Sequence, residues 1–229
     1  SKSESKSESK SESESESESN YLKVKTFNQV FGHPAPNSIK LDILTNEPKV
    51  VELRNALIKE EISELRDAYN NLDIIEVIDA LSDILYVAYG LLVVYGLDGD
   101  QLYSDYMKKR YKNNVPDTFD LLSNFAKTRD YNKNTLILCS PKTFVSSLED
   151  NSVKQLLDTL LNDLDKNMDN LLLYSSEANF DKVTEHTINI IYMTYYIGYI
   201  LDIDLDESVR LVHESNMSKI CDTEELALD

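Results

Sequence analysis

Two adjacent segments, Pro48–Asn70 and Asp73–Tyr95, determine most of what this chain can fold into. In each of them apolar residues recur every three or four positions, which is the period of an amphipathic α-helix. Only a few polar residues separate the segments, and so short a connection makes the two helices antiparallel neighbours. Pro48 suits a first helical turn, where its missing N–H has no partner, and Asp73 can cap the second helix. The sequence therefore predicts a helical hairpin.

The remainder of the chain favours an all-α fold. Only five Gly and five Pro occur in 229 residues, which is typical of long helices and unusual for turn-rich sheets. The segment TLILC, residues 135–139, fits either a short strand or buried coil. Helical periodicity returns in five further segments: Asn20–Gly32, Asp100–Lys112, Ser152–Tyr174, Phe180–Asp202 and Leu205–Ile220. We expect a four-helix-bundle core built from two helical hairpins, with extra helices around it.

The second hairpin is indicated by aligning the sequence with itself at an offset of 106 residues. Without a gap, this offset superposes two pairs of helical segments. The matching residues are Leu65 with Leu171, Ile84 with Ile190, Tyr86 with Tyr192, Tyr89 with Tyr195, Asp98 with Asp204, and Asp100 with Asp206. If the repeat is real, the two hairpins pack as a pseudo-twofold bundle. The alternative is chance agreement between two apolar helices.

The chain divides into a tail and one domain. The first 19 residues, SKSESKSESKSESESESES, contain no apolar side chain, so we expect residues 1–20 to be disordered. Residues 21–229 suit a single all-α domain. Within it, residues 113–180 fit either a less regular insertion or a diverged copy of the first hairpin.

Charge and cysteine content narrow the partners. The net charge is −18, which disfavours nucleic acid and anionic membranes as partners. Cys139 and Cys221 lie far apart and form no CxxC motif, so neither a zinc site nor a disulfide framework is expected. Together with the absence of an apolar signal region, this predicts a reducing, cytoplasmic setting. The longest apolar runs, Ile84–Gly96 and Ile188–Leu201, fall short of the roughly 20 residues of a spanning helix.

Acidic residues interrupt the apolar stripe of both helices in the first hairpin. Glu61 and Glu64 lie on the stripe of the first helix, and Glu76, Asp79 and Asp83 lie on the facing stripe of the second. At about 1.5 Å per residue, the two sets stand at the same height above the turn. Converging carboxylates repel each other unless a proton or a cation neutralises them. All-oxygen ligation suits Mg²⁺, which also meets substrate phosphates.

Each acid also has a plainer explanation. Glu76 fits the third position of a capping box, and Glu60, Glu61 and Glu64 fit a solvated helix face. These explanations must account together for acids on both facing stripes, which favours the metal site. In the second copy most of these positions are no longer acidic. Glu61, Glu64, Glu76 and Asp83 correspond to Asn167, Asn170, Lys182 and Asn189, whereas Asp79 corresponds to Glu185.

The spacing of these acids resembles a known family. EEISE at 60–64, followed after eleven residues by EVID at 76–79, resembles the EExxE…ExxD pattern of the all-α nucleoside triphosphate (NTP) pyrophosphohydrolase superfamily. That superfamily includes MazG-like enzymes, dimeric dUTPases and phosphoribosyl-ATP pyrophosphohydrolases. The segments FNQVFGHP, RNALIKEE, DALSDILYVAYG and VHESNMSK resemble the phosphoribosyl-ATP branch most closely.

The resemblance implies a reaction and roles for individual residues. It implies cleavage between the α- and β-phosphates of a nucleotide substrate, giving a monophosphate and pyrophosphate. Mg²⁺, or alternatively Mn²⁺, would be held by Glu61, Glu64, Glu76 and Asp79. Glu60 and Glu61 would be the catalytic acids, with Glu60 a further ligand or the residue that positions the attacking water. Asp83, Asn216 and Lys219 would contact substrate.

Alternatives remain open at this point. Asn216 and Lys219 also fit a helix C-terminal turn that faces the helix dipole. Within the family, phosphoribosyl-ATP hydrolysis is an alternative activity, and a catalytically inactive helical interaction module is an alternative outside it. Many family members complete their bundle by dimerising, whereas an internal repeat would complete it within one chain and leave one active site. A homodimer is then an additional expectation, with the apolar surface of Tyr192–Tyr199 available for it.

Overall fold

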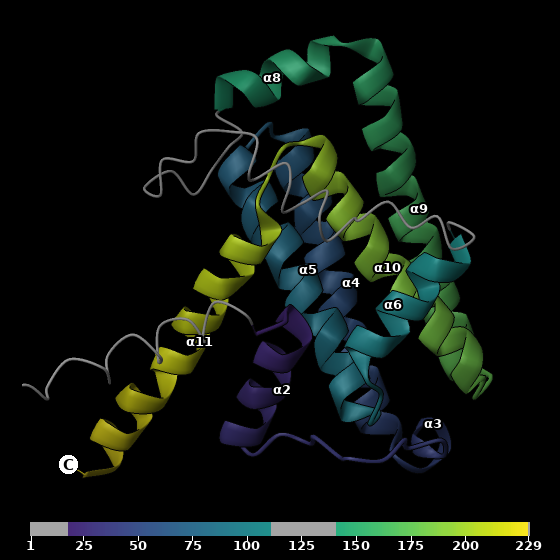
Figure 1. Cartoon of the computed structure of the whole chain (residues 1–229), viewed down its shortest axis with the longest axis vertical. Coiled ribbons are helices and arrows are strands. Elements are labelled where there is room, and N and C mark those ends of the chain that lie inside the picture. The colour runs from purple at the N-terminus through teal and green to yellow at the C-terminus, as the bar shows by residue number, and fades with distance from the viewer. Residues whose placement is uncertain (1–17, 111–140, 229) are drawn as a thin grey trace, which may run out of the picture.

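The computed structural model describes residues 18–110 and 141–228, and the side chains within that range except those of 141–143 and 220–228. The described chain is helical and contains no strand, which confirms the all-α prediction (Figure 1). TLILC lies outside the described residues. The helices are α2 (Asn20–Val30), α3 (Ile43–Asn46), α4 (Pro48–Asn70), α5 (Ile74–Val94), α6 (Gly99–Arg110), α8 (Pro141–Glu149), α9 (Asn151–Ser176), α10 (Phe180–Ile200) and α11 (Leu205–Leu228).

Helix α5 is the centre of the bundle. It packs against α4, α2, α10 and α11, and it lies in the middle of the molecule in Figure 1. By length and composition it is the one helix in the described part of the chain that is apolar enough to cross a membrane, and 83% of its most apolar window is buried inside the protein. Each fully buried Leu or Ile on it contributes about 1.5–3 kcal/mol to folding. Its position at the centre of the bundle therefore accounts for its hydropathy.

The internal repeat is present in the structure. Helices α9 and α10 start their turn and end at positions offset by 106 residues from α4 and α5, and α11 begins at the same offset from α6. Asp73 caps α5 by accepting a hydrogen bond from the backbone N–H of Glu76, and Asn179 caps α10 in the same way through Lys182. The left-handed residues Leu72 and Gly96 correspond to Ala178 and Asp202. The two hairpins therefore form a pseudo-twofold four-helix core, as the offset predicts.

Two equivalent tyrosines meet where the copies pack together. The hydroxyls of Tyr89 on α5 and Tyr195 on α10 lie 3.0 Å apart, and both rings are buried. Asn20 donates to the Tyr195 hydroxyl at 2.9 Å and to Asp206 at 2.8 Å. The first residue of α2 thus ties the N-terminal helix to the second copy of the repeat.

The predicted boundaries need two corrections. The disordered tail was expected to include residue 20, but Ser19 caps α2 by accepting from the Leu22 N–H, and Asn20 is buried. A polar residue that caps a helix or bridges two helices carries no apolar signal in the sequence. Between 113 and 180, the described part is the diverged repeat rather than a less regular insertion, because α9 is a regular helix of 26 residues.

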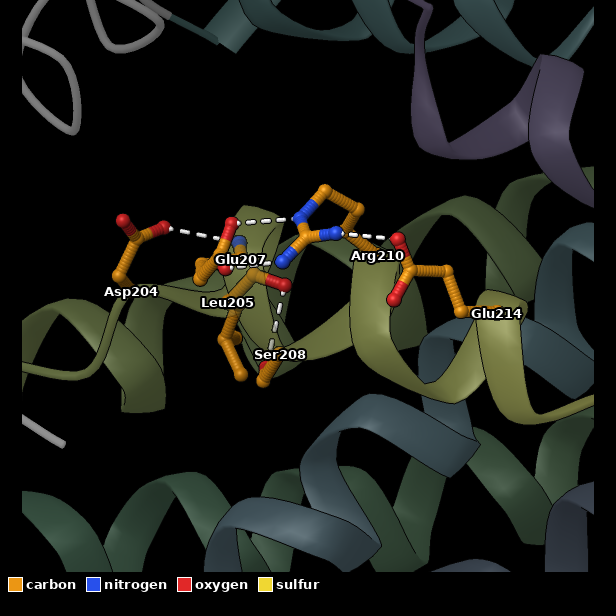
Figure 2. Close-up of polar contacts among 6 residues, drawn as sticks. All are labelled: Asp204, Leu205, Glu207, Ser208, Arg210 and Glu214. Carbon is orange, nitrogen blue, oxygen red and sulfur yellow. Dashed lines mark hydrogen bonds and ion pairs between the residues drawn. The ribbon is translucent and has the colours of Figure 1, made fainter. Parts of the chain in front are cut away.

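Polar contacts anchor the start of α11 against the bundle. Asp204 accepts from the backbone N–H of Glu207, as Asp98 accepts from that of Gln101 before α6. Figure 2 shows the Arg210 guanidinium between Glu207 and Glu214 on the outer face of the helix. On the inner face the hydroxyls of Ser208 and of Ser82 on α5 lie 2.7 Å apart. These contacts hold α11 across α5, close to the acidic residues of the first hairpin.

The end of α5 gives a test of this packing. Gly96 has φ +72°, and a Cβ added there would lie 2.0 Å from the Ser38 carbonyl oxygen. Gly96→Ala should therefore lower the free energy of unfolding by about 2–4 kcal/mol, from left-handed strain and the clash together. Gly32→Ala is the matched control, because its φ is also +72° but nothing lies within 4 Å. It should cost about 1 kcal/mol. Equal losses in urea denaturation would contradict the close approach at Gly96.

Candidate functional site

A cleft of about 620 Å³ opens beside the first hairpin, where α11 crosses the ends of α4 and α5. Six of the eight residues singled out in the sequence line it: Glu64, Glu76, Asp79, Asp83, Asn216 and Lys219. The remaining lining residues are Asp67, Ala68, Asn71, Asp73, Ala80, Val212 and Ser215. Helix periodicity thus brings acids from α4 and α5 together with polar residues from α11, more than 130 positions later in the sequence.

The charges around the cleft are strongly unbalanced. Six carboxylates line it, and Lys219 is the one cation among the lining residues. The arginines of α4 face other partners. Arg66 pairs with Asp165 on α9. Arg54 is largely buried against α5 and Tyr95, where desolvation lowers its pKa. Neither arginine therefore supplies the counter-charge that the cleft requires.

Glu61 lies half-buried beside the cleft and carries the clearest sign of an unmet charge. Its Oε2 atom is buried and has no hydrogen-bond partner. Burial raises the pKa of the Glu61 carboxyl to about 8, and Asp83, Glu64 and Glu60 raise it further through repulsion and a hydrogen bond from Glu64. An unpartnered buried carboxylate oxygen costs free energy that a bound cation can recover. Glu61 is therefore the deepest of the candidate ligands.

The carboxyls on α5 show the same strain to smaller degrees. Burial raises the pKa of Asp83 to about 6, with repulsion from Asp79 and Glu64 added and attraction to Lys219 opposing it. Burial and repulsion from Asp73 also raise the pKa of Asp79. Each raised pKa means that the charged form is disfavoured as the site stands. A positive ligand shared among these groups would relieve all of them at once.

The donor set fits a hard divalent cation, although the side chains do not converge on one point. Within residues 18–110 and 141–228, no group of three or more His, Cys, Asp or Glu side chains stands ready to hold a metal ion. Carboxylates without a counter-charge repel each other and separate. The buried, partnerless oxygen of Glu61 points to a group that the acids would gather around, and carboxylate oxygens are the ligands that Mg²⁺ prefers.

The second copy shows what the same scaffold does without these acids. Asn167 stands at the position of Glu61, and its Oδ1 atom accepts from Asn189 at 3.0 Å and lies 2.8 Å from His186 Nδ1. Lys182, at the position of Glu76, pairs with Glu185 at 2.8 Å. This copy satisfies its own polar groups, whereas the first copy leaves them charged and unpaired. The contrast supports a cation site in the first copy only.

Some site residues lie elsewhere than expected or were missed. Glu60 is exposed and does not line the cleft, so it approaches the site only through its effect on Glu61. Asp67 and Asp73 line the cleft but were not singled out. Asp67 lies three positions after Glu64 on the same helix face, a spacing that would have identified it. The contribution of Asp73 depends on the turn between α4 and α5.

Comparisons with known proteins agree with this geometry. Residues 24–110 match the profile of the phosphoribosyl-ATP pyrophosphohydrolase family. The chain is also 35% identical, over 211 residues, to uncharacterized protein L479 of Acanthamoeba polyphaga mimivirus. That alignment covers 92% of this chain and 75% of the viral protein. No solved structure matches the chain significantly. The family match contains the whole acidic hairpin and ends before the second copy.

The raised carboxyl pKa values predict a pH-dependent stability. Glu61 binds its proton more tightly in the folded state, so its contribution is full below pH 4.5 and is lost as the pH rises through about 8. In EDTA, the melting temperature should therefore fall between pH 5 and 8.5, and Glu61→Gln should reduce the fall. Mg²⁺ at about 100 times its Kd should restore about 2.7 kcal/mol. This restoration should be larger at pH 8.5 than at pH 5, where protons compete.

The second copy provides the matched control for that experiment. Glu185 is the counterpart of Asp79 but pairs with Lys182. Glu185→Gln should leave the Mg²⁺-dependent rise in melting temperature unchanged, while Asp79→Asn should diminish it. A melting temperature that does not respond to Mg²⁺ at pH 8.5 would argue against a cation site among these acids.

Proposed function

Because the chain belongs to the MazG-like all-α NTP pyrophosphohydrolase superfamily, with a phosphoribosyl-ATP pyrophosphohydrolase domain at residues 24–110, we propose that it is a Mg²⁺-dependent nucleotide pyrophosphohydrolase. Its substrate would be a ribo- or deoxyribonucleoside triphosphate. Cleavage would fall between the α- and β-phosphates and release a nucleoside monophosphate and pyrophosphate.

One observation carries the proposal: the first copy gathers unpaired carboxylates at a cleft, and the second copy has neutralised the same positions. Glu61 retains a buried oxygen without a partner, while its counterpart Asn167 is fully engaged. Retaining repelling acids destabilises the fold, so their retention in one copy favours a functional role. An inactive interaction module would have no use for them.

The residues take complementary roles in this proposal. Glu61, Glu64, Glu76 and Asp79 would hold Mg²⁺, with Mn²⁺ as an alternative. Bound there, the cation would neutralise phosphate charge and lower the pKa of a nearby water. Asn216 and Lys219 on α11 would donate to phosphate oxygens across the cleft, opposite the acids. Asp83 lies between Asp79 and Lys219 in its interactions and would link the two groups.

The reaction requires one water and one proton acceptor. The water oxygen forms a bond to the α-phosphorus, the bond from that phosphorus to the bridging oxygen of the β-phosphate breaks, and pyrophosphate leaves with the electron pair. The water loses a proton to a carboxylate, for which Glu60 and Glu61 are our candidates. Glu60 is exposed beside Glu61, which places it where water enters from solvent.

The internal repeat sets the expected stoichiometry. Since one chain supplies both hairpins and only one carries the acids, we propose one active site per chain. A homodimer through the tyrosines of α10 remains part of the proposal. Those rings stack along the helix, with the centroids of Tyr192 and Tyr196 6.0 Å apart and those of Tyr196 and Tyr199 6.4 Å apart.

The family match favours one second candidate, phosphoribosyl-ATP. Its hydrolysis breaks the same kind of bond in the same kind of cleft, so the acids would serve it equally well. The two candidates differ in the group beyond the phosphates. A substrate panel therefore separates them directly.

The direct test is pyrophosphate release over the eight common nucleoside triphosphates and phosphoribosyl-ATP, with Mg²⁺ and with EDTA. We expect turnover of at least one substrate with Mg²⁺ and none with EDTA. Glu61→Gln and Asp79→Asn should each lower kcat/KM by about 100-fold or more, because each removes one ligand charge. Glu185→Gln, the equivalent change in the second copy, should retain full activity. Turnover that is indifferent to Glu61→Gln and Asp79→Asn, or no turnover of any substrate, would refute the enzyme.

Glu60→Gln distinguishes the two roles of Glu60. If Glu60 positions the attacking water, the variant loses turnover and keeps the Mg²⁺-dependent rise in melting temperature. If Glu60 is a further ligand, the variant loses both. Retention of full turnover would remove Glu60 from the catalytic residues.

A further inference from the structure

Four side chains form a hydrogen-bonded series from the cleft into the bundle. Lys219 Nζ donates to Asn216 Oδ1 at 3.3 Å, and both residues line the cleft. The Asn216 amide in turn hydrogen bonds to the hydroxyl of Tyr86, on α5. That hydroxyl lies 3.0 Å from Nδ1 of His213, one turn before Asn216 on α11. Tyr86 and His213 were not singled out in the sequence as site residues.

The direction of each bond follows from the chemistry of the groups. A lysine ammonium can only donate, so the oxygen of the Asn216 amide faces Lys219 and the nitrogen faces Tyr86. The amide nitrogen also can only donate, so the Tyr86 oxygen accepts from it. This direction agrees with the lowering effect of Asn216 on the Tyr86 pKa, which a donor to the phenol oxygen produces. The hydroxyl proton of Tyr86 is then available for His213 Nδ1, which must be unprotonated.

We propose that Tyr86 and His213 are positioning residues that lock the Asn216 amide with its N–H groups as donors, so that the substrate group at Asn216 is an acceptor oxygen of the phosphate chain. An asparagine amide is otherwise free to turn over and exchange its donor and acceptor ends. The inference rests on the proposed function, because it assigns the phosphate end of the nucleotide to the α11 side of the cleft. Lys219 beside Asn216 supplies the one positive charge among the cleft-lining residues.

The surroundings hold the Tyr86 ring in place. Tyr86 is 7% exposed, and the ring of Phe27 on α2 meets it edge-on at a centroid distance of 5.6 Å. The second copy repeats the arrangement. Tyr192, the counterpart of Tyr86, contacts Arg110, the counterpart of Asn216, whose guanidinium lies 4.4 Å from the ring centroid. A tyrosine at this position thus contacts the same position of the following helix in both copies, but only Tyr86 does so beside the acidic cleft.

Kinetics of the full chain test the proposal. Tyr86→Phe keeps the ring and removes the hydroxyl, so it should raise KM about tenfold, the equivalent of one hydrogen bond, while changing kcat less. His213→Gln retains an acceptor for the Tyr86 proton and should stay near wild type, whereas His213→Leu should resemble Tyr86→Phe. Tyr192→Phe is the matched control in the second copy and should leave KM unchanged. Equal KM values for Tyr86→Phe and wild type would overturn the proposal.

Two measurements separate this inference from the proposed function. The ¹⁵N NMR spectrum of the His213 ring should show an unprotonated Nδ1 and a protonated Nε2, and the Asn216 side-chain amide signals should shift in Tyr86→Phe. A protonated Nδ1 in neutral His213 would overturn the inference whatever the activity. Inorganic tripolyphosphate with Mg²⁺ should bind wild type more tightly than Tyr86→Phe by about tenfold. Equal binding of tripolyphosphate would show that Asn216 does not face the phosphates, even if nucleotides are hydrolysed.

Discussion

Mutual repulsion among the carboxylates of the first hairpin is the constraint on which the rest of the site depends. Helices α4 and α5 must bring these acids together, because the apolar stripes that carry them are the faces that pack the bundle. Glu61 is held where its charge is least tolerated, with its pKa raised to about 8. The arginines of α4 are engaged elsewhere, and α11 brings only Lys219 to the lining. The site is therefore arranged for a cation and an anionic substrate to arrive together.

The second copy shows that this strain is not a requirement of the scaffold. The same helix lengths, caps and left-handed turn residues recur 106 positions later, around Asn167 and Asn189 in place of Glu61 and Asp83. Neutral amides complete their own hydrogen bonds, and Lys182 neutralises the one acid that remains, Glu185. Duplication has thus allowed one hairpin to specialise in closing the bundle. The other is left to carry charges that would destabilise an unsupported pair of helices.

Much of the fold and part of the candidate site could be predicted because they depend on residues close together in the sequence. Pro48 and Asp73 mark the helix starts by their own backbone chemistry, and the spacing of Glu64, Asp79 and Asp83 assigns them to facing stripes. Predictions were poorer where a distant contact decides the outcome. Asn20 reads as part of a polar tail until Tyr195 and Asp206 meet it. His33 and Glu60 are near the site in sequence terms and remain exposed in the structure.

The sequence by itself determined the helical hairpins, their duplication and the stripe on which each acid lies, because periodicity and capping are local properties of the chain. Only the tertiary structure decided which acids are strained and which polar groups share the cleft. The unpaired oxygen of Glu61, the diversion of Arg66 to Asp165, and the series from Lys219 to His213 all depend on the approach of helices far apart in sequence. Burial and through-space charge, which set a pKa, have no counterpart in a linear pattern.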